Sequence, residues 1–185
     1  MATKYILGIQ SYASHDSGAS IVKLDTKNNF IDYVCISEER LIRKKYPYTF
    51  PLHSISYCMK YFKIKNINKI DLIVSDWIKL KRWLRSGPSY NYSMFDYLKE
   101  KFKFDKKKII QIDHHLAHAA SVFYTSNFSN SAILIIDGQG SDLETTTYYH
   151  GINNKIIELE KYKNHGIGSA YLAVTRNILN LGTGG

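Results

Sequence analysis

Three of the seven histidines of this chain lie within one short run, at His114, His115 and His118. The run is rich in alanine, which favours a helix, and residues four apart on a helix stand on the same face. We therefore expect His114 and His118 to point into one space, as a two-histidine metal site on a helix requires. Asp113 precedes the run at the position of an N-cap, where its carboxylate can accept a hydrogen bond from a backbone N–H. His115 points elsewhere.

The surrounding sequence strengthens the metal interpretation of this pair. A short apolar run, residues 109–112, precedes the histidines, and a second apolar run, residues 133–136, ends in Asp137, Gly138 and Gly140. Histidines at the same spacing also occur on helices that bind nothing, because histidine is common both on surfaces and in cores. A pair without a ligand therefore remains the alternative at this point.

The composition bounds the class of protein. With 185 residues the chain can form one domain with a hydrophobic core, or one domain and part of a second. Its apolar runs are too short to span a membrane, and its N-terminus lacks the pattern of a signal peptide. Cys35 and Cys58 show no metal or redox spacing, which predicts two buried thiols in a reducing compartment. We therefore expect a cytoplasmic protein without a membrane partner.

The formal net charge of +9 has three interpretations. The lysines are spread over residues 60–69, 79–85 and 99–108, where they are mixed with helix-like segments. We interpret the charge first as a solvated basic face and second as an attraction for an anionic small molecule. Nucleic acid comes third, because no single dense basic patch is visible.

Short apolar, β-rich runs separated by turn residues predict strands. In the first part of the chain they cover residues 5–9, 19–24, 30–37, 70–75 and 109–112. Helical spacing of apolar residues predicts helices over residues 52–62, 90–104 and 114–126. The pattern then restarts, with strands over residues 132–137, 144–150 and 155–161 and a helix over residues 167–181.

One arrangement of elements occurs twice, near residues 5–37 and 132–161: strand, loop with a carboxylate and a glycine, strand, tight turn, strand. Two copies of a meander with helices predict an α/β fold of the duplicated ribonuclease-H-like, actin-like type. We place the first lobe at residues 1–126 and the start of the second lobe at residues 127–185. The second lobe is incomplete and the chain stops in a glycine run, which predicts that these residues are part of a longer protein.

Several motifs follow one another along nearly the whole chain. They are Leu7-Gly8-Ile9, His15-Asp16-Ser17-Gly18-Ala19, Ser37-Glu38-Glu39-Arg40 with Arg43, Phe50-Pro51, the histidine run up to Ser121, Asp137-Gly138-Gln139-Gly140, and Ile167-Gly168-Ser169-Ala170-Tyr171 with Thr175. Each motif alone is weakly specific. The ordered set resembles the N-terminal part of the NodU/CmcH carbamoyltransferases.

This resemblance implies a fold similar to the tRNA threonylcarbamoyl transferases, with an actin-like (ASKHA) domain of two lobes. It also implies a further C-terminal YrdC-like domain that makes carbamoyl-adenylate from carbamoyl phosphate and ATP. The actin-like domain then transfers the carbamoyl group to a hydroxyl of a sugar, an antibiotic or a related small-molecule acceptor. An Fe²⁺ ion or another divalent metal is expected. His114, His118 and Asp137 match its ligands, and a further ligand would come from outside this chain.

Elementary chemistry is consistent with these expectations. Carbamoyl transfer to an alcohol develops negative charge on the carbonyl oxygen and on the leaving phosphate, which a divalent metal stabilises. Gly138 and Gly140 allow backbone N–H groups to approach a phosphate closely. His15 and Asp16, at the equivalent turn of the first copy, could orient or deprotonate the acceptor hydroxyl. The phosphate of the donor could be bound by three cationic side chains, Arg40, Arg43 and Lys44.

Each of these assignments has a simpler alternative. The charged run over residues 38–44 can be a solvated helix start, His15 can cap a turn, and Asp137 can bond its own loop. The family commonly has Glu after the second glycine of its Asp-Gly-x-Gly loop, where this chain has Ser141. Asp142 or Glu144 would have to replace that residue.

The leading functional prediction is the N-terminal part of an O-carbamoyltransferase, inactive as an isolated fragment. One alternative is a tRNA threonylcarbamoyl transferase, which would suit the positive charge. Another is a module that binds a metal or a nucleotide without catalysis. The acceptor cannot be derived from these residues, because acceptor pockets lie in variable loops.

Overall fold

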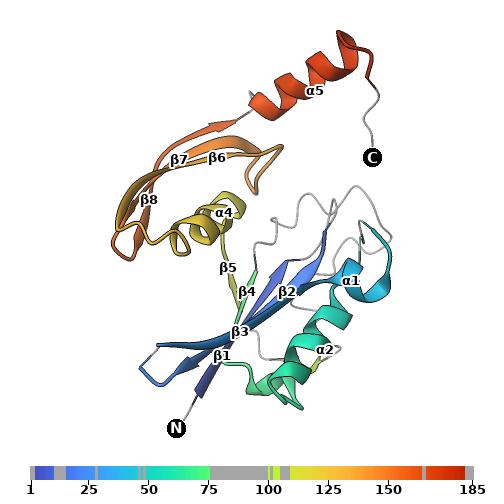
Figure 1. Cartoon of the computed structure of the whole chain (residues 1–185), viewed down its shortest axis with the longest axis vertical. Coiled ribbons are helices and arrows are strands. Elements are labelled where there is room, and N and C mark those ends of the chain that lie inside the picture. Colours follow the sequence, from blue (N-terminus) through green and yellow to red (C-terminus); the bar gives the residue numbers. More distant parts are fainter. Residues whose placement is uncertain are drawn as a thin grey trace. The chain divides into compact units, whose positions relative to one another are not determined.

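The computed structural model of the chain has an α/β fold and divides into two compact units, Met1–Ile112 and Asp113–Gly185 (Figure 1). Each unit has its own sheet and its own hydrophobic core. The structure describes residues 3–10, 16–27, 29–45, 47, 49–75, 100, 102–104, 109–163 and 166–181. The predicted helix over residues 90–104 falls largely outside these ranges.

Unit 1 is built on a five-stranded sheet in the order β3-β2-β1-β4-β5. The first three strands form an antiparallel meander, and the other two continue from β1 as parallel neighbours. A three-stranded meander extended by two parallel strands is the sheet expected for a ribonuclease-H-like unit, so the predicted fold class is confirmed. The strands are β1 (Thr3–Gln10), β2 (Gly18–Asp25), β3 (Phe30–Ser37), β4 (Leu72–Ser75) and β5 (Ile109–Gln111).

Helices pack against this sheet and close the core of unit 1. α1 (Glu38–Ile42) follows β3 directly, and α2 (Leu52–Tyr61) packs on β2 and β3. A short 3₁₀ helix, Ile67–Lys69, leads into β4. The centre of the core contains fully buried aliphatic side chains from both layers, including Leu7, Ile21, Ile55 and Ile73. Burial of one face of β1, β2, β4 and α2 thus accounts for the apolar patterns of these segments.

A buried carboxylate, Glu38, joins the start of α1 to the start of α2. Its side chain is 1 % exposed and accepts hydrogen bonds from the backbone N–H and the hydroxyl of Ser54, at 2.7 and 2.6 Å. It also accepts from the backbone N–H of His53 at 3.1 Å and lies 2.6 Å from His53 Nδ1. Pro51, the N-cap residue of α2, makes no side-chain cap. The carboxylate of Glu38, from α1, instead accepts the free N–H groups in the first turn of α2.

The interpretation of residues 38–44 as a solvated helix start is therefore wrong for Glu38. The cause is tertiary, since α2 places two backbone N–H groups around this carboxylate. Arg40 and Lys44 are exposed, as that interpretation expects.

The two cysteines differ in environment. Cys58 on α2 is buried, and burial raises the pKa of its thiol to about 11. Cys35 is exposed, so the prediction of two buried thiols is wrong for this residue. β3 is an edge strand of the sheet, and several of its side chains face solvent.

Among the helices that the structure describes, none is long and apolar enough to cross a membrane.

Unit 2 repeats the antiparallel meander with three strands, β6 (Asn130–Ile136), β7 (Glu144–Ile152) and β8 (Lys155–Lys163). α4 (His114–Phe123) packs on this sheet, and α5 (Ile167–Asn177) follows β8. The core contains Ala119, Phe123, Ile133, Ile135 and Tyr149. The three predicted strands and both predicted helices of this region are confirmed, with bounds that differ by a few residues.

The sequence predicts a boundary between the lobes after residue 126, with the histidine helix in the first lobe. The compact units instead divide between Ile112 and Asp113. The physical reason is the packing of α4, which buries Ala119 and Phe123 in one cluster with residues of β6 and β7. The histidine helix and Asp137 therefore belong to the same unit.

Glu38→Gln should lower the free energy of unfolding by about 1–3 kcal/mol at pH 7, because a neutral amide replaces the buried acceptor of several hydrogen bonds. Burial by itself raises the pKa of Glu38, but hydrogen bonds from Ser54 and His53 outweigh it and hold the pKa below its ordinary value of 4.5. The native state therefore binds this proton less readily than the unfolded state. Its stabilising contribution is complete above pH 4.5 and is lost as the pH falls towards the lower native pKa.

Urea titrations of wild type and Glu38→Gln between pH 3 and pH 8 check this expectation. The stability gap between the two proteins should narrow on acidification. A gap that is constant over the whole range would contradict the assignment, and Glu39→Gln, at the neighbouring and less buried position, is the matched control.

Candidate metal centre

α4 presents its histidines in the way its sequence predicts. Asp113 has an extended backbone at the N-cap, and its Oδ1 accepts a hydrogen bond from the N–H of Leu116 at 3.1 Å. His115 is fully buried on another face of the helix, where its Nδ1 lies 2.7 Å from Thr147 Oγ1. Burial lowers the pKa of His115, which favours the neutral ring. His115 therefore anchors α4 to β7, whereas the rings of His114 and His118 lie near Asp137.

Asp137 is placed by the end of β6. Its backbone N–H donates to the carbonyl of Thr145 at 2.9 Å, which continues the hairpin between β6 and β7 by one bond. One carboxylate oxygen, Oδ1, accepts the N–H of Gly138 at 2.6 Å, so the alternative that Asp137 bonds its own loop is correct for this oxygen. The other oxygen, Oδ2, faces the histidines of α4.

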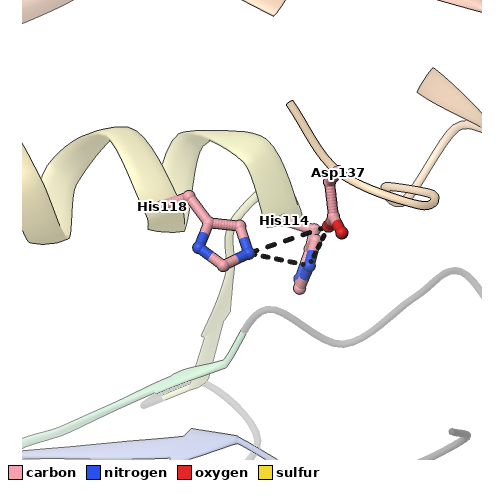
Figure 2. A group of neighbouring side chains, drawn as sticks. All are labelled: His114, His118 and Asp137. Atoms are coloured by element: carbon pink, nitrogen blue, oxygen red, sulfur yellow. Dashed lines mark hydrogen bonds and ion pairs between the residues drawn. The ribbon is translucent and has the colours of Figure 1, made fainter. Parts of the chain in front are cut away.

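Three side chains converge at this point (Figure 2). His114 Nε2 lies 2.9 Å from Asp137 Oδ2 and 3.1 Å from His118 Nε2. His118 Nε2 lies 3.7 Å from the same carboxylate oxygen. The three ligand-type atoms are all within 4.8 Å of one another. The structure thus brings together His114, His118 and Asp137, the three residues predicted as metal ligands.

The separations between these atoms are those expected when all three bind one metal ion. Metal–ligand bonds of about 2.0–2.2 Å at angles of roughly 90–120° place two ligand atoms about 2.8–3.8 Å apart. The three observed separations, 2.9, 3.1 and 3.7 Å, fall in this range. When both imidazoles are neutral, each Nε2 can turn a lone pair towards the same point as the carboxylate. Two imidazoles and one carboxylate suit Fe²⁺ or Zn²⁺ and leave coordination positions open.

The cluster is accessible to solvent. The side chains of His114, Asp137 and His118 are 22 %, 31 % and 51 % exposed. Their backbones are nevertheless held by the helix and by the hairpin, so the atoms that would bind a metal sit on ordered elements. A small ligand could therefore reach an ion held here without unfolding of unit 2.

The glycine loop after Asp137, residues 138–140, does not present its backbone N–H groups to a phosphate as predicted. The N–H of Gly138 donates to Asp137 Oδ1, and the N–H of Gly140 donates to the backbone carbonyl of Glu144 at 2.7 Å. Both N–H groups are thus engaged within the loop and do not face open space as a phosphate contact requires. Ser141 Oγ accepts the backbone N–H of His114 at 3.0 Å, a contact that sequence reasoning missed.

The other predicted site residues belong to unit 1. His15 lies outside the described residues. Asp16 is exposed and has a left-handed backbone with φ 62°, as suits a tight turn before β2. Arg40 is 73 % exposed beside Glu39, and Arg43 caps the C-terminal end of α1 with φ 58°, next to the exposed Lys44. The structure therefore assembles the metal ligands within unit 2 and leaves the predicted anion-binding cations on the surface of unit 1.

Comparison with known proteins defines the family. A family model described as carbamoyltransferase N-terminus matches residues 82–180, which is more than half of the chain. The chain belongs to this family. It is 30 % identical over 200 residues to protein sll1178 of Synechocystis and 30 % identical over 152 residues to the nodulation protein NolNO of Sinorhizobium fredii. It is also 26 % identical over 170 residues to protein MJ1051 of Methanocaldococcus jannaschii. The resemblance to the NodU/CmcH carbamoyltransferases is thereby confirmed.

The chain spans about a third or less of the length of these relatives. The alignments cover 92 %, 74 % and 92 % of this carbamoyltransferase-family chain, but only 31 %, 22 % and 29 % of sll1178, NolNO and MJ1051. Among solved structures, YeaZ from Pseudomonas aeruginosa aligns with a TM-score of 0.45 at 10 % identity, over 86 % of this chain and 66 % of YeaZ.

Asp113→Ala should lower the free energy of unfolding by about 1 kcal/mol, because the N–H of Leu116 loses its cap acceptor. Asp113→Asn should retain most of the stability, since an asparagine side chain caps equally well. Chemical denaturation followed by circular dichroism compares the three proteins. Equal midpoints for the alanine variant and wild type would show that this cap does not hold α4.

Proposed function

We propose that this chain is the N-terminal part of an O-carbamoyltransferase in which His114, His118 and Asp137 hold a divalent metal ion, with Fe²⁺ as the expected metal. The observation that carries the proposal is the convergence of their three ligand atoms within 4.8 Å. Family membership supports the reaction class, and the distances support the ligand set. A metal bound there would act as a Lewis acid on the carbamoyl oxygen and on the phosphate of the donor.

The side chains of unit 2 would contribute a fixed, partly charged ligand set. Asp137 keeps one oxygen on the N–H of Gly138, which orients the other oxygen towards the histidines. His114 and His118 are one turn apart on α4, so their Nε2 atoms cannot separate without a change of rotamer. This arrangement holds the ligand atoms close together before any metal arrives, which lowers the entropy lost on binding.

The side chains of unit 1 would handle the donor phosphate and the acceptor. Arg40, Arg43 and Lys44 are three exposed cations within five residues, and arginine can grip a phosphate with two hydrogen bonds. The ion pair between Arg40 and Glu39 is long, at 3.7 Å, and exposed, so the guanidinium can exchange partners readily. Asp16, together with His15, would orient or deprotonate the hydroxyl of the acceptor.

The proposed reaction also requires a carbamoyl donor and a hydroxyl acceptor. We expect carbamoyl-adenylate as the donor, made from carbamoyl phosphate and ATP by a YrdC-like domain of the longer protein. The acceptor would be a small molecule with a free hydroxyl, such as a sugar, an antibiotic or a related metabolite. Transfer to tRNA is the alternative among enzymes, and a metal- or nucleotide-binding module without catalysis is the alternative outside them.

His114→Ala and His118→Ala should each lower iron affinity by about 100-fold or more, since second-sphere changes alone typically lower metal affinity 10–100-fold. Metal analysis of protein purified and reconstituted without oxygen provides the measurement. His150→Ala is the matched control, because His150 is a partly buried histidine of the same unit that contacts Asn130. Equal iron in wild type and both ligand variants would remove the metal assignment.

Labelled carbamoyl-adenylate should transfer its carbamoyl group to small alcohols, and not to tRNA, when the longer protein is assayed. The present chain alone should show no transfer, because it covers only 31 % of the length of sll1178 and 22 % of that of NolNO. Transfer to tRNA would favour the alternative enzyme. No transfer to either acceptor by an intact, iron-loaded longer protein would favour the non-catalytic module.

A further inference from the structure

Glu144, the first residue of β7, is a buried carboxylate that the metal cluster does not use. Its side chain is 0 % exposed. Oε2 accepts the backbone N–H of Asp142 at 2.6 Å, and Oε1 has no hydrogen-bond partner in the part of the chain that the structure describes. Burying a carboxylate oxygen without a hydrogen bond costs free energy, so the position of Glu144 requires a structural or functional explanation.

The loop over residues 137–144 is folded around this carboxylate. The backbone carbonyl of Glu144 accepts the N–H of Gly140 at 2.7 Å. A Cβ atom at position 140 would lie 2.1 Å from Glu144 Oε1, so a larger residue there would require the Glu144 side chain to move. Leu143 has φ 71°, a left-handed conformation that turns the chain back towards Gly140. Glu144 thus fills the inside of the loop and binds it from two sides.

The same loop connects two of the three ligand residues. Asp137 begins it, held by the bond from its N–H to the carbonyl of Thr145. Ser141, at its tip, accepts the backbone N–H of His114 at 3.0 Å. Glu144 is therefore connected to His114 in three steps. Its carboxylate accepts the N–H of Asp142, Asp142 follows Ser141 in the chain, and Ser141 accepts the N–H of His114.

We propose that Glu144 is a positioning residue of the metal centre, which holds the 137–144 loop so that Ser141 fixes the N-terminus of α4 against Asp137. The inference rests on the metal site proposed above and deepens it. Glu144 would touch neither the metal nor a substrate. It would act through Asp142 and Ser141 on the spacing between His114 and Asp137, which is 2.9 Å between ligand atoms.

The hydrogen bond, and not the charge alone, carries this role. Glu144→Gln keeps a carbonyl oxygen that can accept the N–H of Asp142, whereas Glu144→Ala removes the acceptor and empties the inside of the loop. Gly140→Ala offers a second route, because its Cβ would displace the carboxylate without removing it. The order of effects among these variants distinguishes positioning from a general loss of stability.

Titration with Co²⁺, followed by its visible absorption, tests the proposal. Glu144→Ala and Gly140→Ala should weaken Co²⁺ binding about 10–100-fold, the range typical of groups behind metal ligands, and Glu144→Gln should lie much nearer to wild type. Glu160→Ala, which removes an exposed carboxylate from β8, should bind as wild type does. Wild-type affinity in Glu144→Ala, under conditions where circular dichroism shows it folded, would overturn the proposal.

Amide hydrogen exchange, resolved by NMR on the metal-free chain, gives a second measurement that needs no metal. Glu144→Ala and Ser141→Ala should both accelerate exchange at the amide of His114. A role confined to the loop would accelerate exchange at Gly140 and Asp142 alone, and that result would overturn the proposal. If wild type bound Co²⁺ no better than His118→Ala, the proposed metal site would fail, while the exchange at His114 would still decide the role of Glu144.

Discussion

The close approach of α4 to the sheet of unit 2 is the contact on which the candidate site depends. Ala119 and Phe123 are buried in this interface, and a Cβ at position 151 would lie 2.5 Å from the ring of Phe123. The glycine on β7 thus lets the helix pack at a short distance. Once this buried face is fixed, the helical repeat leaves His114 and His118 beside the end of β6, where Asp137 begins its loop.

Polar contacts then add direction to this apolar packing. The fully buried His115 bonds Thr147 on β7, which fixes the rotation of α4 about its axis. The cap residue of the helix, Asp113, also lies 3.6 Å from Lys161 Nζ on β8. Apolar contacts alone would allow the helix to rotate or slide, because they are not directional. The paired polar groups define one arrangement of α4 on the sheet, and the distances among His114, His118 and Asp137 follow from it.

The two units use a buried glutamate in related ways. Glu38 follows β3 and collects donors from the first turn of α2, and Glu144 starts β7 and collects a donor from the loop before it. Both side chains are almost completely buried, at 1 % and 0 % exposure. In unit 1 the carboxylate joins the start of α1, which carries Arg40, to the start of α2, and in unit 2 it joins the start of β7 to the loop that follows Asp137. The backbone N–H of Glu38 also donates to the carbonyl of Ser17, which ties the start of α1 to the residue that follows Asp16.

Residue patterns were enough to predict the strands and helices of both meanders, the cap at Asp113 and the shared face of His114 and His118. These features depend on periodicity and on contacts between near neighbours, which a sequence displays directly. The resemblance to a family also predicted His114, His118 and Asp137 as metal ligands, and the structure brings these three side chains together. Long-range packing places α4 in unit 2, buries Glu38 and Glu144, and closes the loop after Asp137 on Glu144. Those outcomes depend on which distant backbone donors surround a side chain, and the spacing of residues along the chain does not contain that information.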